Sequence, residues 1–347
     1  MKGRVFGTLS NGTEAQLFTI QNVNNMQMSV TNYGAILTSL KIPCKGKLLE
    51  VTLGFHSLEE YLSEAYKKQN PCFGAIVGRY ANRVAKAKLP VEGIVYELTR
   101  NFGEDQLHGG FKGFSNVLWN VEEVVDGEEA KITLSYKSQH LEEGFPGNVD
   151  VVVSYILTVN NELRIEYKGI TDKPTHLNLT QHSYFNFNED KSPITNHFLQ
   201  VNATHYLEAD KRNVPTGKFL PIENSVVDFL NSKSIGEQLK IQPNGFDHAL
   251  VLKKTSTEPE FAARVIEKNS GLAMEVYTTE PSVHIFTANH FDGTLVNKNG
   301  IVFGKHAGLC IEAQHFPDSP NKLNFPSTLL LPNEIYSQIT VHKFFEI

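Results

Sequence analysis

Apolar and polar residues alternate with a period of two along much of the chain. Residues 149–159 carry an apolar or aromatic side chain at every second position, and residues 163–167 repeat the alternation after Asn160 and Asn161. Side chains of a β-strand point alternately to its two faces, so this pattern predicts two long strands, each with one apolar face. The asparagine pair between them predicts an antiparallel hairpin. Shorter alternating runs at 132–136 and 283–287 predict further strands.

Helical patterns are short and few. Ser57, followed three residues later by Glu60, forms a capping-box pattern and predicts a short helix towards Tyr61 and Leu62. Residues 235–239 predict one or two further helical turns. Many strands with few helices predict an all-β fold, a β-sandwich or barrel, rather than a parallel α/β fold.

The chain shows no repeat of fixed period, no low-complexity tract and no linker. The charged segments 122–131 and 253–260 are expected to be exposed turns, because strand-like sequence resumes on both sides of each. We therefore expect one large β-domain that spans residues 1–347.

Composition narrows the class of protein. Among 347 residues, 32 Lys and Arg stand against 38 Asp and Glu, and the formal net charge of −6 disfavours a nucleic-acid partner. No stretch approaches the roughly 20 apolar residues of a membrane helix, so no membrane partner is expected. The N-terminus lacks the apolar segment of a signal peptide, and the three cysteines have no C-x-x-C spacing. These features predict a cytoplasmic protein in a reducing compartment.

Two histidines stand in polar clusters that interrupt the structural pattern. His108 lies in the segment LHGG, where paired glycines would let the backbone approach a ligand, although an exposed turn is the simpler explanation of this motif alone. His182 lies in the segment LTQHSYFNF, where aromatic and polar residues alternate as they do in sugar-binding sites. A hydrogen-bonded core histidine is the structural alternative.

Two carboxylates and two arginines are the other candidates. Asp247 precedes an apolar run and could serve only to form a turn. Glu312 ends an apolar run, where a half-buried carboxylate is costly unless it is paired or functional. Arg79 and Arg83, four residues apart, offer fork-shaped donors suited to hydroxyls and anions, and structural arginines would show the same spacing.

Several cofactor and nucleophile motifs are missing from the sequence. There is no G-x-S-x-G, no P-loop and no G-x-G-x-x-G, so serine hydrolase, nucleotide and dinucleotide functions have no support. His284 and His290 stand six residues apart without a matching set of Cys or Glu ligands. We expect neither a metal nor another cofactor.

Taken together and in this order, the clusters resemble the galactose mutarotase (aldose 1-epimerase) family. The resemblance extends from near residue 30 to beyond residue 330. The matching segments are 78–84 (GRYANRV), 107–110 (LHGG), 180–187 (TQHSYFNF), 245–248 (GFDH) and 311–321 (IEAQHFPDSPN).

The resemblance implies a large antiparallel β-sandwich with a sugar cleft and no cofactor. It also implies a role for each matching residue: Glu312 as general base, His182 as general acid, His108 as a second imidazole near the ring oxygen, Asn82, Arg83 and Asp247 as hydroxyl-binding residues, and Tyr184 beside the acid. It selects Arg83 rather than Arg79. Glu280 stands where family members carry Gln, and its carboxylate is expected to accept hydrogen bonds from sugar hydroxyls.

The function implied is the interconversion of the α and β anomers of free D-galactose and D-glucose by acid/base ring opening and closure. A hexose-6-phosphate 1-epimerase is an alternative, for which Arg79 is the basic group nearest to the motifs. A non-catalytic sugar-binding module is another, although it would be expected to lose the acid or the base. A glycosidase would need two carboxylates, such as Asp247 and Glu312.

Overall fold

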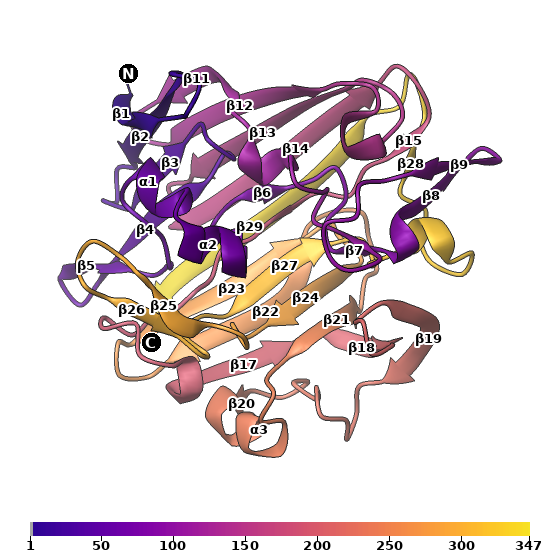
Figure 1. Cartoon of the computed structure of the whole chain (residues 1–347). Helices are drawn as coiled ribbons and strands as arrows, with labels where there is room; N and C mark the ends of the chain where they lie inside the picture. Colours follow the sequence, from indigo (N-terminus) through magenta and orange to yellow (C-terminus); the bar gives the residue numbers. More distant parts are fainter. Residues whose placement is uncertain (1–2) are drawn as a thin grey trace.

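Residues 3–347, which the computed structural model describes, are built around a nine-stranded antiparallel sheet (Figure 1). Every pairing in this sheet is antiparallel. The strands lie in the order β11 (Asn120–Val125), β12 (Ala130–Ser138), β13 (Val149–Leu157), β14 (Glu162–Thr171), β29 (Tyr336–Glu346), β23 (Leu272–Thr278), β22 (Glu260–Glu267), β17 (His197–Val201) and β20 (Lys233–Ser234).

Two five-stranded sheets complete the sandwich. The first contains β1 (Arg4–Thr8), β2 (Glu14–Gln21), β3 (Gln27–Thr31), β4 (Leu37–Cys44) and β5 (Lys47–Glu50). The second runs in the order β19 (Pro215–Pro221), β18 (Ala203–Ala209), β21 (Asp247–Leu252), β24 (Ser282–Phe286) and β27 (Cys310–Gln314). The largest apolar core contains side chains from all three sheets, such as Val30, Val151 and Ile311. The prediction of a large antiparallel β-sandwich is confirmed.

Short elements surround the large sheets (Figure 1). The two-stranded pairs are β6 (Ile76–Val77) with β16 (Thr180–Gln181), β7 (Arg83–Val84) with β10 (Gln106–Leu107), β8 (Lys88–Val91) with β9 (Ile94–Glu97), β15 (Thr175–His176) with β28 (Leu329–Leu330), and β25 (Asp292–Val296) with β26 (Val302–Gly304). The α-helices of the described chain are α1 (Leu58–Tyr61), α2 (Glu64–Gln69) and α3 (Ile235–Ile241). Single 3₁₀ turns are found at Ala85–Ala87, Phe114–Asn116, Glu142–Gly144, Ile194–Asn196 and Ser319–Asn321.

The predicted hairpin is the pair β13–β14. Leu157 pairs with Leu163 across it, and the alternate residues Val151 and Val153 are fully buried. The strand ends at Leu157, so Val159, which the alternation placed in the strand, lies in the turn and is exposed. The strand ends there because the Thr158 N–H donates to the carbonyl of Glu162 and closes the turn early.

Both predicted helices are present. Helix α1 begins after Ser57, whose N–H donates to Glu60 Oε2 at 3.0 Å, and α3 covers the predicted segment 235–239. Helix α2 was not predicted. The expected turn at 122–131 is largely wrong, because β11 and β12 extend into it and leave only residues 126–129 between them; the expected turn that begins at Lys253 is confirmed up to β22.

The register of β21, β24 and β27 separates an apolar face from a polar face. Leu250, Val283 and Ala313 lie opposite one another and pack into the core. At the next paired position of β24 and β27, His284 lies opposite Glu312, and both face away from the core. This second face is where the functional site lies.

Two expectations from composition concern the cysteines and the membrane. Cys44, Cys72 and Cys310 are all buried and free. Within residues 3–347, no helix is long and apolar enough to cross a membrane.

Tyr155 links two of the sheets. Its hydroxyl donates to the buried carbonyl of Ala35 at 2.8 Å. We expect Tyr155→Phe to lower the free energy of unfolding by about 1–3 kcal/mol, because the carbonyl loses its partner in the core. Urea unfolding measures the change, with Tyr96→Phe, at a half-buried position, as the control. Equal stability of the two variants would contradict this role.

Candidate active site

A cavity of about 640 Å³ opens over the polar face of β21, β24 and β27. Seven of the eight residues proposed from the sequence line it: Asn82, Arg83, His108, His182, Tyr184, Asp247 and Glu312. They come from segments far apart in the chain, so the fold itself assembles the cavity. The eighth, Glu280, does not line it.

Short strand pairs bring the N-terminal half of the site together. The pairing of β7 with β10 sets Leu107 opposite Arg83, and so places His108 beside Asn82. The pairing of β6 with β16 holds the segment that leads into His182. Both pairs contain only two residues per strand; β16 packs against β27 of the larger sheet, and β7 and β10 pack against the 3₁₀ turns at Ser319–Asn321 and Ala85–Ala87.

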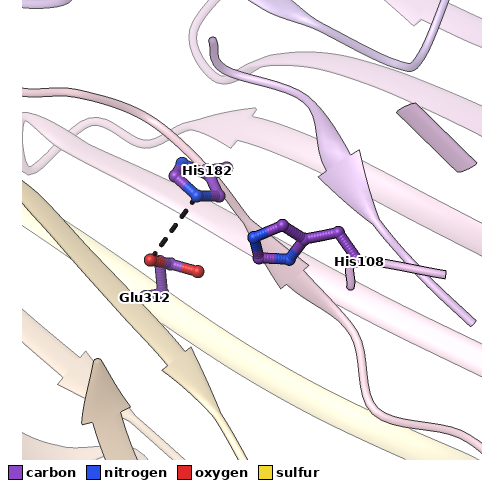
Figure 2. Close-up of side chains that lie close together, drawn as sticks. All are labelled: His108, His182 and Glu312. Atoms are coloured by element: carbon purple, nitrogen blue, oxygen red, sulfur yellow. Dashed lines mark ion pairs between the residues drawn. The ribbon is translucent and has the colours of Figure 1, made fainter. Parts of the chain in front are cut away.

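His108 is held in one tautomer by the backbone. The Asn82 N–H donates to His108 Nδ1 at 3.1 Å, so this ring nitrogen carries no proton and Nε2 carries it. Figure 2 shows the ring extending towards His182 and Glu312. Burial, followed by the charges of His182 and Arg83, lowers the pKa of His108 well below its ordinary value. His108 is therefore a neutral hydrogen-bond donor into the cavity.

The glycines after His108 serve packing rather than ligand approach. A Cβ on Gly109 would lie 1.9 Å from the carbonyl oxygen of Gly78, and Gly109 has a φ of +82°. The close approach expected from the paired glycines is therefore to the protein's own backbone. This contact fixes the turn that presents the His108 ring.

His182 and Glu312 form the central pair of the cavity (Figure 2). His182 Nε2 lies 3.6 Å from Glu312 Oε1, and both side chains are almost completely buried. The ring of Tyr184 stacks on the imidazole, with centroids 5.2 Å apart. Glu312 Oε2 has no hydrogen-bond partner within the described residues. A buried carboxylate oxygen without a partner is costly, which is typical of a functional site.

Asp247 is held as a carboxylate. His284 Nε2 lies 2.5 Å from Asp247 Oδ1, and the Arg83 guanidinium lies 3.6 Å from Oδ2. Burial alone would raise the pKa of Asp247, but the hydrogen bond and charge of His284, with the charge of Arg83, lower it below its ordinary value. The carboxylate therefore stays ionised and available as a hydrogen-bond acceptor.

His284 is a cavity residue that the sequence analysis missed. It lines the cavity and lies 3.3 Å, ring nitrogen to amide nitrogen, from Asn82. Its other ring nitrogen faces Asp247, so His284 connects the Asn82 side chain to the Asp247 carboxylate. The signal in the sequence was a polar residue within the alternating run 283–287. Any half-exposed strand carries such residues, so this one did not indicate a functional site.

His108, His182 and Glu312 also have the composition of a zinc site. Their candidate ligand atoms lie within 4.8 Å of one another. The geometry of His108 does not fit a metal, because its Nε2 already carries the proton and moving that proton to Nδ1 would oppose the Asn82 N–H. A donor at this position suits an oxygen of a neutral ligand.

Arg79 and Glu280 lie away from the cavity. The Arg79 guanidinium is buried and donates to the carbonyls of Ser138, Gln139 and Pro146. Glu280 is buried beside His315, whose Nδ1 lies 2.7 Å from its carboxylate, and the pair borders a different cavity. Both side chains support the surrounding structure.

The fold and the cavity together define a class of protein. It is an all-β protein whose cavity combines a carboxylate, imidazoles and an arginine, a set suited to acid/base chemistry on a small molecule rich in hydroxyl groups.

The comparisons with known proteins identify the family. The family model described as "Aldose 1-epimerase" matches residues 16–343, and the chain belongs to this family. The chain is 40% identical to the galactose mutarotase of Mus musculus over 344 residues, which cover 98% of this chain and 97% of the mouse protein. It is 32% identical to the aldose 1-epimerase of Escherichia coli K12, with 96% of each chain covered.

Solved structures agree with this assignment. A GalM/aldose epimerase homologue from C. elegans superimposes with a TM-score of 0.86 and 27% identity, covering 96% of this chain and 99% of the other. The galactose 1-epimerase of Lactobacillus acidophilus NCFM gives a TM-score of 0.84 at 27% identity, covering 99% of this chain and 98% of the other.

The Glu280–His315 pair makes stability depend on pH. Burial opposes the charge of His315, but the charge and hydrogen bond of Glu280 outweigh burial and raise the pKa of His315. A raised pKa contributes stability that is fully present below the unfolded value, about 6.5, and is lost as the pH rises through the folded value. We therefore expect Glu280→Gln to destabilise the protein at pH 6 more than at pH 9.

Urea unfolding at the two pH values measures this difference, and the rate of mutarotation serves as the control. The rate is expected to stay at the wild-type value because Glu280 lies outside the cavity. A lower rate, or a destabilisation that is the same at both pH values, would contradict the assignment.

Proposed function

We propose that this protein is an aldose 1-epimerase that interconverts the α and β anomers of D-galactose and D-glucose. The names of its relatives support the reaction, since the mouse and human proteins are galactose mutarotases and the Escherichia coli protein is an aldose 1-epimerase. The cavity supports a single free hexose as the substrate class, because its polar groups are suited to hydroxyls.

The proposed chemistry moves two protons. Glu312 takes the proton of the C1 hydroxyl, and the electron pair of that O–H bond forms the C1=O1 double bond. The bond between C1 and the ring oxygen breaks, its electron pair goes to the ring oxygen, and His182 supplies a proton there from Nε2. Rotation about C1–C2 presents the other face of the aldehyde, and the reverse transfers close the ring. The steps need proton transfer only.

The pair formed by His182 and Glu312 carries the proposal. O1 and the ring oxygen are bonded to the same carbon, so an acid and a base must lie close together to reach both. The two side chains are 3.6 Å apart and line the same cavity. The neutral N–H of His108 is directed at the same place, where it would stabilise negative charge that develops on an oxygen.

We propose that Asn82, Arg83 and Asp247 bind the hydroxyls remote from C1, and that His284 belongs to the same set. Arg83 and His284 already hold the Asp247 carboxylate from two sides, so donors and acceptors are oriented before the sugar enters. Preorganised partners lower the entropy lost on binding. Glu280 is left out of this set because it borders a different cavity.

The alternatives each lack support at the site. A 6-phosphate would need a free basic group, and the guanidinium of Arg79 is committed to backbone carbonyls. A non-catalytic module would have no use for a buried acid/base pair. A glycosidase with Asp247 as its second carboxylate would need that group unencumbered, and it is tied to His284 and Arg83.

We further propose that residues 1–347 form one domain that functions in the cytoplasm. The single largest core, which contains both Phe18 and Phe344, supports the first point. The buried, free thiols support the second, since they suit a reducing compartment.

Replacement of the base should separate binding from turnover. Glu312→Gln keeps the shape of the side chain but cannot take the C1 hydroxyl proton. We expect the rate of mutarotation to fall by about 10²–10⁴-fold, the usual contribution of a positioned acid or base, with galactose still bound. Polarimetry on freshly dissolved α-D-galactose measures the rate, and calorimetry measures the affinity.

An aryl galactoside is the control substrate for the wild-type protein. Its C1 oxygen has no proton to give up, so an epimerase leaves it intact, whereas a glycosidase cleaves it. Near-wild-type mutarotation by Glu312→Gln, or rapid cleavage of the glycoside, would overturn the mechanism.

Loss of the cavity arginine should weaken sugar binding. We expect Arg83→Ala to raise the Michaelis constant for galactose by about 10–100-fold, since a hydrogen bond to a charged group is worth roughly 1.5–3 kcal/mol. Arg212→Ala is the matched control, because Arg212 pairs with Asp105 and Asp210 outside the cavity. If both variants keep the wild-type Michaelis constant, Arg83 does not bind the sugar.

A further inference from the structure

The second ring nitrogen of His182 has an unusual partner. Nε2 faces Glu312, and on the other side of the ring Nδ1 lies 3.6 Å from the sulfur of Cys310. Cys310 is the first residue of β27 and shares its face with Glu312, two residues further along. Strand β27 therefore carries both Glu312, the proposed base, and Cys310, which lies behind His182, the proposed acid.

Cys310 remains a thiol. Its side chain is completely buried, and burial, followed by the charge of Glu312, raises its pKa well above the ordinary value. The other groups that face the His182 ring are the edge of His108, with ring centroids 5.3 Å apart, and the stacked ring of Tyr184. His290 lines the same cavity. None of these rings lies at Nδ1 in place of the sulfur.

We propose that Cys310 is a positioning residue for the acid, whose sulfur accepts a hydrogen bond from His182 Nδ1–H while Nε2 exchanges its proton with the sugar. This proposal rests on the proposed function, in which His182 is that acid. Nothing in it requires Cys310 to touch the sugar.

The protonation states of the reaction explain why a thiol suits this place. Before ring opening the imidazolium carries protons on both nitrogens. After Nε2 gives its proton to the ring oxygen, the neutral ring carries its remaining proton on Nδ1. In both states Nδ1–H needs an acceptor in a buried setting, and the sulfur is the atom within reach.

A thiol also suits the other tautomer of the neutral ring. When the neutral ring carries its proton on Nε2, towards Glu312, the S–H can rotate and donate to Nδ1. A carboxylate or a carbonyl could only accept, and would bind the Nδ1 proton so firmly that the imidazolium became a weaker acid. The thiol is a weak partner that can both donate and accept, so it leaves the Nε2 proton free to move in either direction.

Substitution at Cys310 should shift the alkaline limb of the pH–rate profile, because the proposed acid must be protonated to act. In Cys310→Ala the buried Nδ1–H has no acceptor, so we expect the limb to move to lower pH by about half to one unit. In Cys310→Ser the hydroxyl is the stronger acceptor, and we expect the limb to move to higher pH. If Cys310 had only a structural role, the two substitutions would not be expected to shift the limb in opposite directions.

Cys72→Ala is the matched control. Cys72 is also buried and free, and it makes no hydrogen bond to His182 within the described residues, so the variant should lose similar packing and keep the wild-type limb. Mutarotation by polarimetry from pH 5 to pH 9 gives the profiles. Limbs that stay in place in both Cys310 variants, or move in the same direction, would overturn the proposal.

A second measurement is independent of turnover. Nitrogen-15 NMR of the imidazoles, with His182 assigned by comparison with His182→Gln, follows the titration of this ring without sugar. The same opposite shifts are expected for Cys310→Ala and Cys310→Ser, and identical titrations in all three proteins would overturn the proposal even if one variant were too unstable to assay. Absence of mutarotation in the wild-type protein, with the NMR shifts present, would instead overturn the proposed function alone.

Discussion

The site depends on the strand register of β21, β24 and β27. Because neighbouring side chains of a strand point to opposite faces, one alignment of three strands sets Ile311 and Ala313 into the core and Glu312 into the cavity. A slip of one residue would exchange the two faces, burying the carboxylate among apolar side chains. The apolar core is what forbids that slip, so the same contacts that stabilise the sandwich also fix the position of Glu312. Core packing and cavity geometry are here a single constraint.

The two carboxylates on the cavity face differ in how completely they are hydrogen-bonded. Asp247 is satisfied by His284 and Arg83 and stays ionised, whereas Glu312 keeps one buried oxygen without a partner. An unsatisfied buried oxygen destabilises the folded protein, and natural proteins tolerate such groups mainly where function requires them. The difference between the two carboxylates follows from their neighbours, since both lie on the same face of the same sheet. This difference agrees with the proposed roles, in which Asp247 binds the sugar and Glu312 transfers the proton.

The sequence predicted the parts of this protein that depend on local pattern. Alternation located the β13–β14 hairpin, and the caps located α1, because both signals lie within a few neighbouring residues. Helix α2 was not predicted, because Tyr66 is its only buried side chain and its sequence has no apolar periodicity. Ser63 at its start could have been recognised as an N-cap residue. His284 was missed for a different reason. Its neighbour across the sheet, Glu312, is far away in the sequence, and only the pairing of β24 with β27 brings the two together. Glu280 was placed at the sugar by the resemblance alone, and the local sequence could not reveal that its side chain borders another cavity.

His108 and His182 show how one side-chain type acquires two roles from what lies behind it. The backbone N–H of Asn82 can only donate, so it keeps Nδ1 of His108 unprotonated and makes that ring a fixed donor. The thiol behind His182 can donate or accept, so it is compatible with a proton on either nitrogen of that ring. The two rings meet edge to face in one cavity. The two histidines therefore differ in the group on the far side of each ring, which lies behind the ring rather than in the cavity.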